Sequence, residues 1–574
     1  MELGIVPGVS SPLTSEGTKM MEDNLDSETP VSTPAPEVDP AKRHEQPFDE
    51  LALTLSGGGY RAAAFHLGVM DMLQRLGLLE SVRVLSTVSG GTFTGMKYAL
   101  SLVEGVAYED FYTGLRDFLK NNNVIGDALG GLQDRPGTPF EGQMPSLIRG
   151  AAKVFASPEM FGDKRLDVLL DNDTSHLKEV SFNATEFSTG NYFRVLRTES
   201  AAADIGNEKF AVRRDVARMM RLADIAAASS CFPGAFEPLR FPDDFLWPQD
   251  LGEVRKALGP DFQSCLALMD GGIYDNQGVA SVVRTYKRKG NRVGLVIISD
   301  TNQRSPVSDT PQTDDTRRAR RDPLFDFKPE KRRGHVTLGT VKVLLWVAFV
   351  LSVLSSAALV GAWIRFDSGS LMMDILLYGF PLVLSAGVAV ALFWLRCRWQ
   401  EAQKSVADLT TIELWPYLKT MTVPELIYLI SGRAKSALAL TSSVFMKRVR
   451  DLIYKDIKIY PKYQGREVSN LIYDLDDTGK FRKDVVEKIE PTEELRELSR
   501  EAEGVATALW IKGPEDLNNL IACGQATTCF NLMRYILESR TPQLDLGSTR
   551  EAEIFAAAEK FWQQLKDDRY ALLR

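Results

Sequence analysis

The pattern of apolar and polar residues changes several times along the 574-residue chain. Residues 1–46 are rich in Pro, Ser, Thr and Glu and lack the positive start and apolar run of a secretory signal, which predicts a flexible tail. From residue 47 to 303, short apolar runs alternate with Gly-rich turns and amphipathic stretches. Strand-like runs followed by helical patterns, as at 51–55 and 82–88, predict an α/β domain with a largely parallel sheet.

A polar, charged stretch over 304–342 reads as an exposed linker, and two long apolar segments follow it. Residues 343–364 and 375–395 contain 22 and 21 residues without a charge. Each is long enough to cross a hydrocarbon core of about 30 Å as a helix. The pattern therefore predicts a transmembrane hairpin, with a pair of buried core helices as the alternative.

Basic residues flank the two apolar segments on their outer sides, whereas the short loop between them offers only Arg365. The positive-inside rule then places both soluble parts on the cytoplasmic side. We expect an integral membrane protein whose catalytic domain and both termini face the cytoplasm, at the inner membrane if the source is a bacterium. The flanking residues are Lys328, Lys331, Arg332, Arg333 and Lys342 before the hairpin, and Arg396, Arg398 and Lys404 after it.

Residues 396–574 have a mainly helical pattern with one short strand-like run, at 471–473, and no motif for separate chemistry. The net charge of the chain is −8, which argues against nucleic acid as a partner. The five cysteines are odd in number and lack metal-type spacing, which favours a reducing compartment. We expect no metal and no other cofactor.

A glycine-rich turn between a strand and a helix is the first candidate site. Residues 51–62 read LALTLSGGGYRA, so that Gly57, Gly58 and Gly59 follow an apolar strand. Such a loop exposes backbone N–H groups beside a helix N-terminus and can hold an oxyanion or a phosphate. The same glycines also fit the dinucleotide-binding fingerprint. That reading requires an acidic residue at the end of the next strand, where this chain has Ser89 instead.

Ser89 stands in Thr87-Val-Ser-Gly-Gly91, between a strand and a helical pattern. A serine on a sharp strand-to-helix turn is typical of a nucleophile elbow, and the helix N-terminus favours developing negative charge. An ordinary strand-to-helix turn is the alternative. The first position of the elbow is Thr87 where the usual pattern has Gly.

A nucleophilic serine needs a base, and only four histidines are present, at 44, 66, 176 and 335. His66 falls within the first predicted helix, where a packed histidine is expected. The alternative base is a carboxylate in Leu268-Met-Asp-Gly-Gly272. Asp270 ends an apolar run before two glycines, and burial would raise its proton affinity enough for general base catalysis.

The glycine-rich turn, the Ser89 segment and the Asp270 segment, in this order, resemble the patatin-like phospholipase family, including its bacterial members. Residues 182–190 and 226–234 are similar to two further segments of that family, so the resemblance covers about 48–302. It implies a three-layer α/β hydrolase in which Ser89 is the nucleophile, Asp270 the base, and Gly57, Gly58 and Gly59 the oxyanion hole. Arg61 would contact a lipid phosphate or, alternatively, form a salt bridge that locks the loop.

The family implies hydrolysis of acyl esters of glycerophospholipids through an acyl-enzyme, with the hairpin as an insertion that holds the domain against the bilayer. Lysophospholipase or neutral-lipid esterase activity is the nearest alternative. A catalytically silent membrane-anchored regulator and a nucleotide-binding protein are alternatives of other classes. The stretch 503–509 resembles helices found late in bacterial members, so the C-terminal region is expected to complete the hydrolase fold.

Overall fold

The computed structural model describes residues 46–130, 145–172, 175–199, 205–262, 264–289, 293–304, 338–364, 465–538 and 550–574, with short pieces between 383 and 454. The chain forms two compact units. Met1–Arg304 and Arg448–Arg574 together make the first, and Ser305–Lys447 makes the second. Most of the predicted tail and of the second apolar segment lies outside the described residues.

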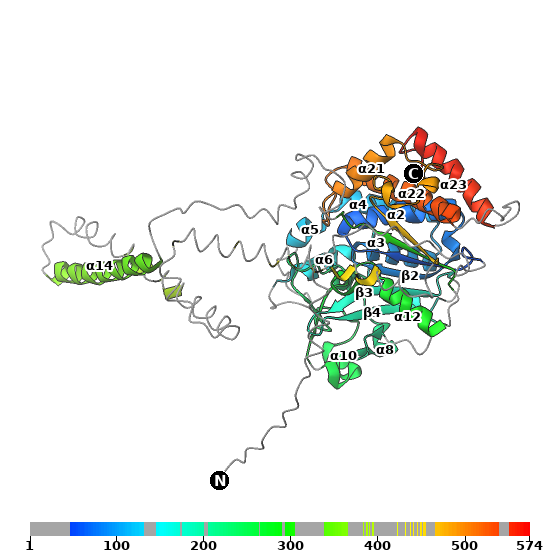
Figure 1. The fold of residues 1–574 in the computed structure, drawn as a ribbon. Helices are drawn as coiled ribbons and strands as arrows, with labels where there is room; N and C mark the ends of the chain where they lie inside the picture. The colour runs from blue at the N-terminus through cyan, green and yellow to red at the C-terminus, as the bar shows by residue number, and fades with distance from the viewer. Residues whose placement is uncertain are drawn as a thin grey trace, which may run out of the picture. The chain divides into compact units, whose positions relative to one another are not determined.

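A single sheet organises the first unit, in the strand order β10-β9-β1-β2-β3-β4-β5-β6 (Figure 1). The five strands from β10 to β3 run parallel, and β4, β5 and β6 continue antiparallel. β8 pairs antiparallel with β3 and β7. The predicted α/β fold with a mostly parallel central sheet is confirmed. The strands are β1 (Leu51–Leu55), β2 (Val82–Val88), β3 (Glu179–Glu186), β4 (Asn191–Thr198), β5 (Ile205–Gly206), β6 (Ala211–Val212), β7 (Leu239–Phe241), β8 (Leu266–Asp270), β9 (Leu295–Asp300) and β10 (Glu467–Leu471).

Helices cover both faces of this sheet, because each parallel strand buries side chains on both sides. In β1, Leu51, Leu53 and Leu55 enter the larger apolar core, whereas Ala52 joins a smaller one together with residues of α12. The helices of the region up to Asp300 are α2 (Gly59–Arg75), α3 (Gly90–Glu104), α4 (Tyr108–Asn121), α5 (Val124–Gly130), α6 (Leu147–Phe155), α7 (Asp167–Leu170), α8 (Arg214–Ala217), α9 (Leu222–Ser229), α10 (Leu251–Leu258), α11 (Gly272–Asp275) and α12 (Val279–Lys289).

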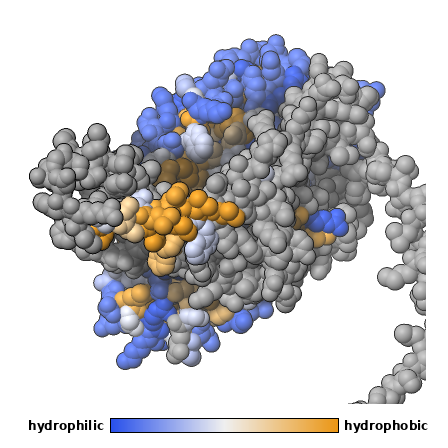
Figure 2. All heavy atoms as spheres, turned by 90° about the vertical axis from the view of Figure 1, so that its left-hand side faces the viewer, coloured by the Kyte–Doolittle hydropathy of each residue, from blue (hydrophilic) through white to orange (hydrophobic). Residues whose placement is uncertain are grey.

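The C-terminal region belongs to the same unit. β10 adds a parallel edge strand beside β9, and α22 packs on α2, with α21 and α23 next to it (Figure 1). The two long helices approach closely where both have glycine: a Cβ on Gly68 would lie 1.9 Å from the carbonyl oxygen of Ile521, and one on Gly524 would lie 2.1 Å from that of Phe65. The region is helical as predicted, with α20 (Lys483–Val486), α21 (Glu493–Gly504), α22 (Pro514–Glu538) and α23 (Arg550–Asp567). The part of the surface seen at the top of Figure 2 is mostly hydrophilic.

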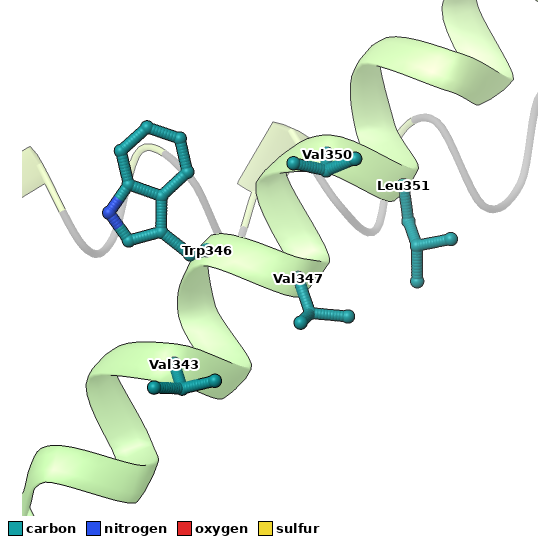
Figure 3. Close-up of a pocket in the computed structure, with 5 residues that line it drawn as sticks. All are labelled: Val343, Trp346, Val347, Val350 and Leu351. Carbon is teal, nitrogen blue, oxygen red and sulfur yellow. The ribbon is translucent and has the colours of Figure 1, made fainter.

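The second unit contains α14 (Leu338–Ile364), whose side chains are described in part. Five apolar residues line a hollow along one side of it, namely Val343, Trp346, Val347, Val350 and Leu351 (Figure 3). Each of them is at least 46% exposed. By length and hydropathy, none of the helices within the described residues qualifies as a membrane span. The structure therefore gives the predicted transmembrane hairpin no support.

Candidate active site

The carboxyl ends of neighbouring strands bring the three predicted motifs to one edge of the sheet. β1 and β2 lie side by side, with Leu55 opposite Thr87, so the glycine-rich loop and Ser89 leave the sheet together. β3 continues past this edge, and Asp270 at the end of β8 pairs with its residue Ala184. Val88 pairs with Asn183, the neighbour of Ala184, which places Ser89 and Asp270 beside each other.

Ser89 has the backbone of a sharp turn. Its φ is 50°, and it is the one residue other than glycine with a positive φ in the described part of the chain. Such a conformation costs about 1–3 kcal/mol and persists only where the surroundings enforce it. The Ser89 N–H donates to Ser229 Oγ (2.9 Å), and its carbonyl accepts from Thr92 N–H (2.9 Å) as α3 begins. The predicted elbow geometry is therefore present.

The glycines of the elbow and of the loop interlock. A Cβ on Gly90 would lie 2.0 Å from the carbonyl oxygen of Gly59, and one on Gly91 would lie 2.3 Å from that of Leu55. A Cβ on Gly57 would be 3.1 Å from that of Ser89 and 2.4 Å from Asn276 Oδ1. Gly90 and Gly91 need to be glycine because backbone meets backbone there, whereas a Cβ on Gly57 would meet side-chain atoms.

Asp270 is buried, and its carboxylate accepts a hydrogen bond from the Gly272 N–H at 2.7 Å. Burial raises the pKa of Asp270 from 3.8 to about 6, although this hydrogen bond and the nearby Ser89 hydroxyl act in the opposite direction. At neutral pH the carboxylate is ionised, with the serine hydroxyl near it. This geometry and this pKa suit a general base.

The described histidines have other partners. His66 is fully buried, with Nδ1 2.8 Å from Ser299 Oγ and Nε2 2.9 Å from the Ser56 carbonyl oxygen. Burial lowers its pKa to about 4. It packs in α2, as expected from its place in the sequence. The ring of His176 lies 3.3 Å from the Tyr98 hydroxyl, and burial, followed by the charge of Arg83, lowers its pKa to about 4. Residues 44 and 335 lie outside the described residues.

The three N–H groups of the glycine-rich loop differ in availability. Gly57 donates to the Asn276 carbonyl oxygen at 3.0 Å, and Tyr60, just after the loop, donates to that of Ala508 at 2.8 Å. Within the described part of the chain, Gly58 and Gly59 donate to no backbone acceptor outside α2. Both have positive φ, 147° and 61°. Of the three predicted donors, Gly57 is thus the one with a backbone partner among the described residues, and Gly58 and Gly59 are not.

Arg61 is 6% exposed, and its Nη1 donates to the Val505 carbonyl oxygen at 3.1 Å. It forms no ion pair with any residue that the structure describes. Burial, followed by the neighbouring charge of Arg450, lowers its pKa to about 10, so the guanidinium stays charged at neutral pH. The contact that the structure shows is thus with the C-terminal region.

Two parts of the site were not predicted as such. Ser229 links the elbow to the sheet, because its Oγ accepts from Ser89 N–H and donates to the Asn183 carbonyl oxygen (2.7 Å). It lies within the segment 226–234 that resembles the family, which was the available signal. The second part is the stretch after α21. It was expected to be helical, but α21 ends at Gly504 and Val505 is extended (ψ 133°), so that prediction is wrong.

The stretch after α21 is not helical because its carbonyl groups accept hydrogen bonds from the loop. The Val505 carbonyl accepts from Arg61, and the Ala508 carbonyl accepts from Tyr60. A helical segment would direct these carbonyls along its own axis and would leave the loop residues without acceptors. In the described part of the chain, no group of His, Cys, Asp and Glu side chains is arranged to hold a metal ion.

Residues 53–283 match the family model described as patatin-like phospholipase. This part of the chain is thus similar to the patatin-like phospholipase family. A search of curated proteins finds no match. Solved structures with similarity include human GIVD cytosolic phospholipase A2, at 16% identity and a TM-score of 0.29 over 44% of this chain and 45% of that one. The structure of the same human enzyme in complex with methyl gamma-linolenyl fluorophosphonate and terbium chloride has 18% sequence identity and a TM-score of 0.29. The match covers 50% of this chain and 45% of that one.

VipD from Legionella pneumophila gives 12% identity and a TM-score of 0.25 over 89% of this chain and 97% of that one. The similarity to the human enzyme spans less than half of that enzyme's chain. The patatin-like phospholipase domain points to a lipid carboxylic-ester hydrolase.

Proposed function

We propose that the protein is a serine lipid acyl hydrolase that cleaves acyl esters of glycerophospholipids through a Ser89–Asp270 dyad. The observation that carries this proposal is the strained strand-to-helix turn at Ser89, which brings the serine to the same edge of the sheet as the buried Asp270 carboxylate, near enough for its hydroxyl to lower the pKa of that group. The domain match over 53–283 supports the substrate class.

In the first half of the reaction, Ser89 Oγ attacks the ester carbonyl carbon while its proton passes to Asp270. The carbonyl oxygen becomes an oxyanion, which the Gly58 and Gly59 N–H groups and the N-terminus of α3 would stabilise. The first turn of α3 contains no acidic residue that would oppose this charge. The C–O bond to the glycerol oxygen then breaks, and that oxygen takes the proton from Asp270. An acyl-Ser89 ester and a lysophospholipid result.

In the second half, Asp270 accepts a proton from water, and the resulting hydroxide attacks the acyl-enzyme. The tetrahedral intermediate collapses, Ser89 recovers its proton from Asp270, and a fatty acid leaves. The same carboxylate thus acts as base, then acid, in each half. A pKa near 6 suits both roles close to neutral pH.

We also propose that the second unit associates with the bilayer that supplies the substrate, with the first unit on the cytoplasmic side. The charge-free stretch 343–364 and the exposed apolar residues of α14 support this part of the proposal. Flotation of the full-length protein with phospholipid vesicles tests it. Retention on vesicles after alkaline carbonate treatment is expected for the transmembrane hairpin, and release by carbonate would contradict that form of attachment.

The direct test of activity compares wild type, Ser89→Ala and Asp270→Ala on phospholipid vesicles, with free fatty acid measured without added metal. Release by wild type and its loss in both folded variants are expected. Parallel assays with lysophospholipid and triacylglycerol separate the lysophospholipase and neutral-lipid alternatives. A wild-type protein that releases no fatty acid from any of these lipids and reacts with no fluorophosphonate serine probe would be the silent regulator instead.

A further inference from the structure

The C-terminal region touches the proposed oxyanion loop at a stretch that lies outside the matched domain. The N–H of Tyr60 donates to the Ala508 carbonyl oxygen (2.8 Å), and the Arg61 guanidinium donates to that of Val505 (3.1 Å). Gly59 lies so close to Ala508 that a Cβ there would meet its carbonyl oxygen at 2.3 Å. Three successive residues of the loop thus rest on one short piece of chain.

That piece of chain has no regular hydrogen bonding of its own, because α21 ends at Gly504 and α22 begins at Pro514. It is fixed from its N-terminal side instead. The carboxylate of Glu503 accepts from Arg304 through the backbone N–H (2.6 Å), Nε (2.9 Å) and Nη2 (2.6 Å). The Glu503 carbonyl oxygen accepts from Gln303 Nε2 at 2.8 Å.

The Arg304–Glu503 pair is largely withdrawn from water, since each side chain is 13% exposed. Arg304 also pairs with Asp476 at 2.6 Å. Burial opposes the charge of Arg304, but the hydrogen bonds to Glu503 and Asp476 prevail and raise its pKa. A forked, charge-assisted contact of this kind fixes orientation as well as distance. Arg304 is the last residue of the first unit before the second unit begins.

We infer that the stretch 503–508 is a positioning element for the oxyanion loop, and that Glu503, held by Arg304, is the residue that fixes it. Figure 1 shows α22 beside α2, the helix that follows the loop, and α21 next to α22. Arg61 is then a positioning residue that ties the loop to this stretch through Val505. This inference rests on the proposed function, because it concerns the loop that would hold the oxyanion.

The test is Glu503→Ala in the full-length protein, with Glu538→Ala as the matched control. Glu538 forms an ion pair with Arg534 on α22, away from the loop. The burial is similar, because the Glu538 side chain is 18% exposed and that of Arg534 is 12% exposed. The readouts are the rate at which a fluorophosphonate labels Ser89, and kcat and KM on a soluble short-chain ester. Both reactions place negative charge on an oxygen in the oxyanion hole.

For Glu503→Ala we expect the labelling rate and kcat to fall by about 10- to 100-fold with KM within about twofold, less than the loss from removing an oxyanion donor outright. Glu503→Gln, which keeps the acceptor oxygen, should lie between this variant and wild type. Glu538→Ala should stay within about twofold of wild type, as expected for an ion pair remote from the site. A purely structural role of Glu503 would lower the melting temperature without this fall in kcat and labelling.

Hydrogen exchange of the Tyr60 amide gives a second readout that needs no turnover. Its bond to Ala508 should open more often in Glu503→Ala and not in Glu538→Ala. Arg304→Lys, which keeps the charge but loses the fork, replaces Glu503→Ala if that variant does not fold. Equal labelling, equal kcat and equal Tyr60 exchange in the Glu503 and Glu538 variants would overturn the inference and leave the proposed function standing. Absence of labelling and hydrolysis in wild type would instead refute the proposed function, and the inference with it.

Discussion

The matched domain and the C-terminal region contribute different things to the same site. Residues 53–283 supply each proposed reacting group, and these stand in short motifs at strand ends. Residues 465–574 supply no reacting group, yet backbone carbonyls of this region meet α2 and the glycine-rich loop at Ile521, Val505 and Ala508. Chemistry is concentrated in one region, and the shape of the loop that would stabilise the transition state depends on both.

The energetic character of the two contributions also differs. The matched domain holds strained or costly features, the positive φ of Ser89 and the buried carboxylate of Asp270. The C-terminal contacts are packing, backbone hydrogen bonds and the largely buried Arg304–Glu503 ion pair. Strain at a functional site persists only where the surrounding structure enforces it, and the backbone of Ser89 is held by Ser229 and Thr92 within the matched domain.

Removal of the reacting groups should have the largest effect. Ser89→Ala and Asp270→Ala are each expected to lower kcat on phospholipid vesicles by about 10³-fold or more, because the two act as a unit. The double variant should be no worse than the single ones. His66→Asn, which keeps a polar side chain at the same buried position, serves as a comparison and should retain kcat within about tenfold if the variant folds. Equal loss in His66→Asn would point to a histidine base.

A methyl group added where the glycine-rich loop meets the C-terminal region should have the next largest effect on kcat. Gly59→Ala places a Cβ 2.3 Å from the Ala508 carbonyl oxygen at a φ of 61°. We expect kcat to fall by about 100-fold and the free energy of unfolding by about 2–4 kcal/mol. Gly77→Ala is the matched control, because it has the same type of backbone (φ 65°) with nothing within 4 Å. It should cost only about 1 kcal/mol and leave kcat unchanged.

The buried carboxylate predicts a dependence of stability on pH. The pKa of Asp270 is about 6 in the folded protein and 3.8 as a free group, so the folded state binds more protons between these values and loses stability as the pH rises through them. Asp270→Asn should therefore raise the free energy of unfolding at pH 7 by up to about 3 kcal/mol while abolishing turnover. The gain should shrink as the pH falls towards about 4. A gain that is independent of pH would contradict this origin. In wild type, kcat/KM should fall about tenfold per pH unit below about 6.

The smallest effect tests the packing of α22 on α2 without touching the site. Gly68→Ala directs a methyl group into the Ile521 carbonyl oxygen at 1.9 Å and should lower the free energy of unfolding by about 1–3 kcal/mol. Gly114→Ala in α4, with nothing within 4 Å, should raise it by up to about 1 kcal/mol because alanine favours helix. Chemical denaturation of both variants gives the comparison. Equal effects would show that the close approach of the two helices does not limit stability.

Features set by residues close together in the sequence could be predicted, and features set by distant residues could not. The strand, glycine and serine pattern predicted the elbow, since a sharp turn is specified by adjacent residues. The helical nature of the C-terminal region was also predictable from its periodicity. The irregular, non-helical form of 505–508 was not, because the carbonyls of Val505 and Ala508 accept hydrogen bonds from Arg61 and Tyr60, more than 400 residues away. The sequence also predicted Gly57 as a donor of the oxyanion hole. It could not show that the Gly57 N–H donates to the carbonyl oxygen of Asn276, which is distant in the sequence.

By itself the sequence determined the α/β class, the order of the motifs and the choice of the proposed reacting groups, because strands, turns and side-chain chemistry depend on neighbours along the chain. Only the tertiary structure decided three further points. Ser89 and Asp270 come from different strands to the same edge of the sheet, Gly57 donates its N–H to Asn276 whereas Gly58 and Gly59 have no such partner among the described residues, and a stretch beyond the matched domain contacts the loop. The physical reason is that these points depend on which groups come together in space. Around the loop these are peptide groups, and each carries the same donor and acceptor whatever its side chain.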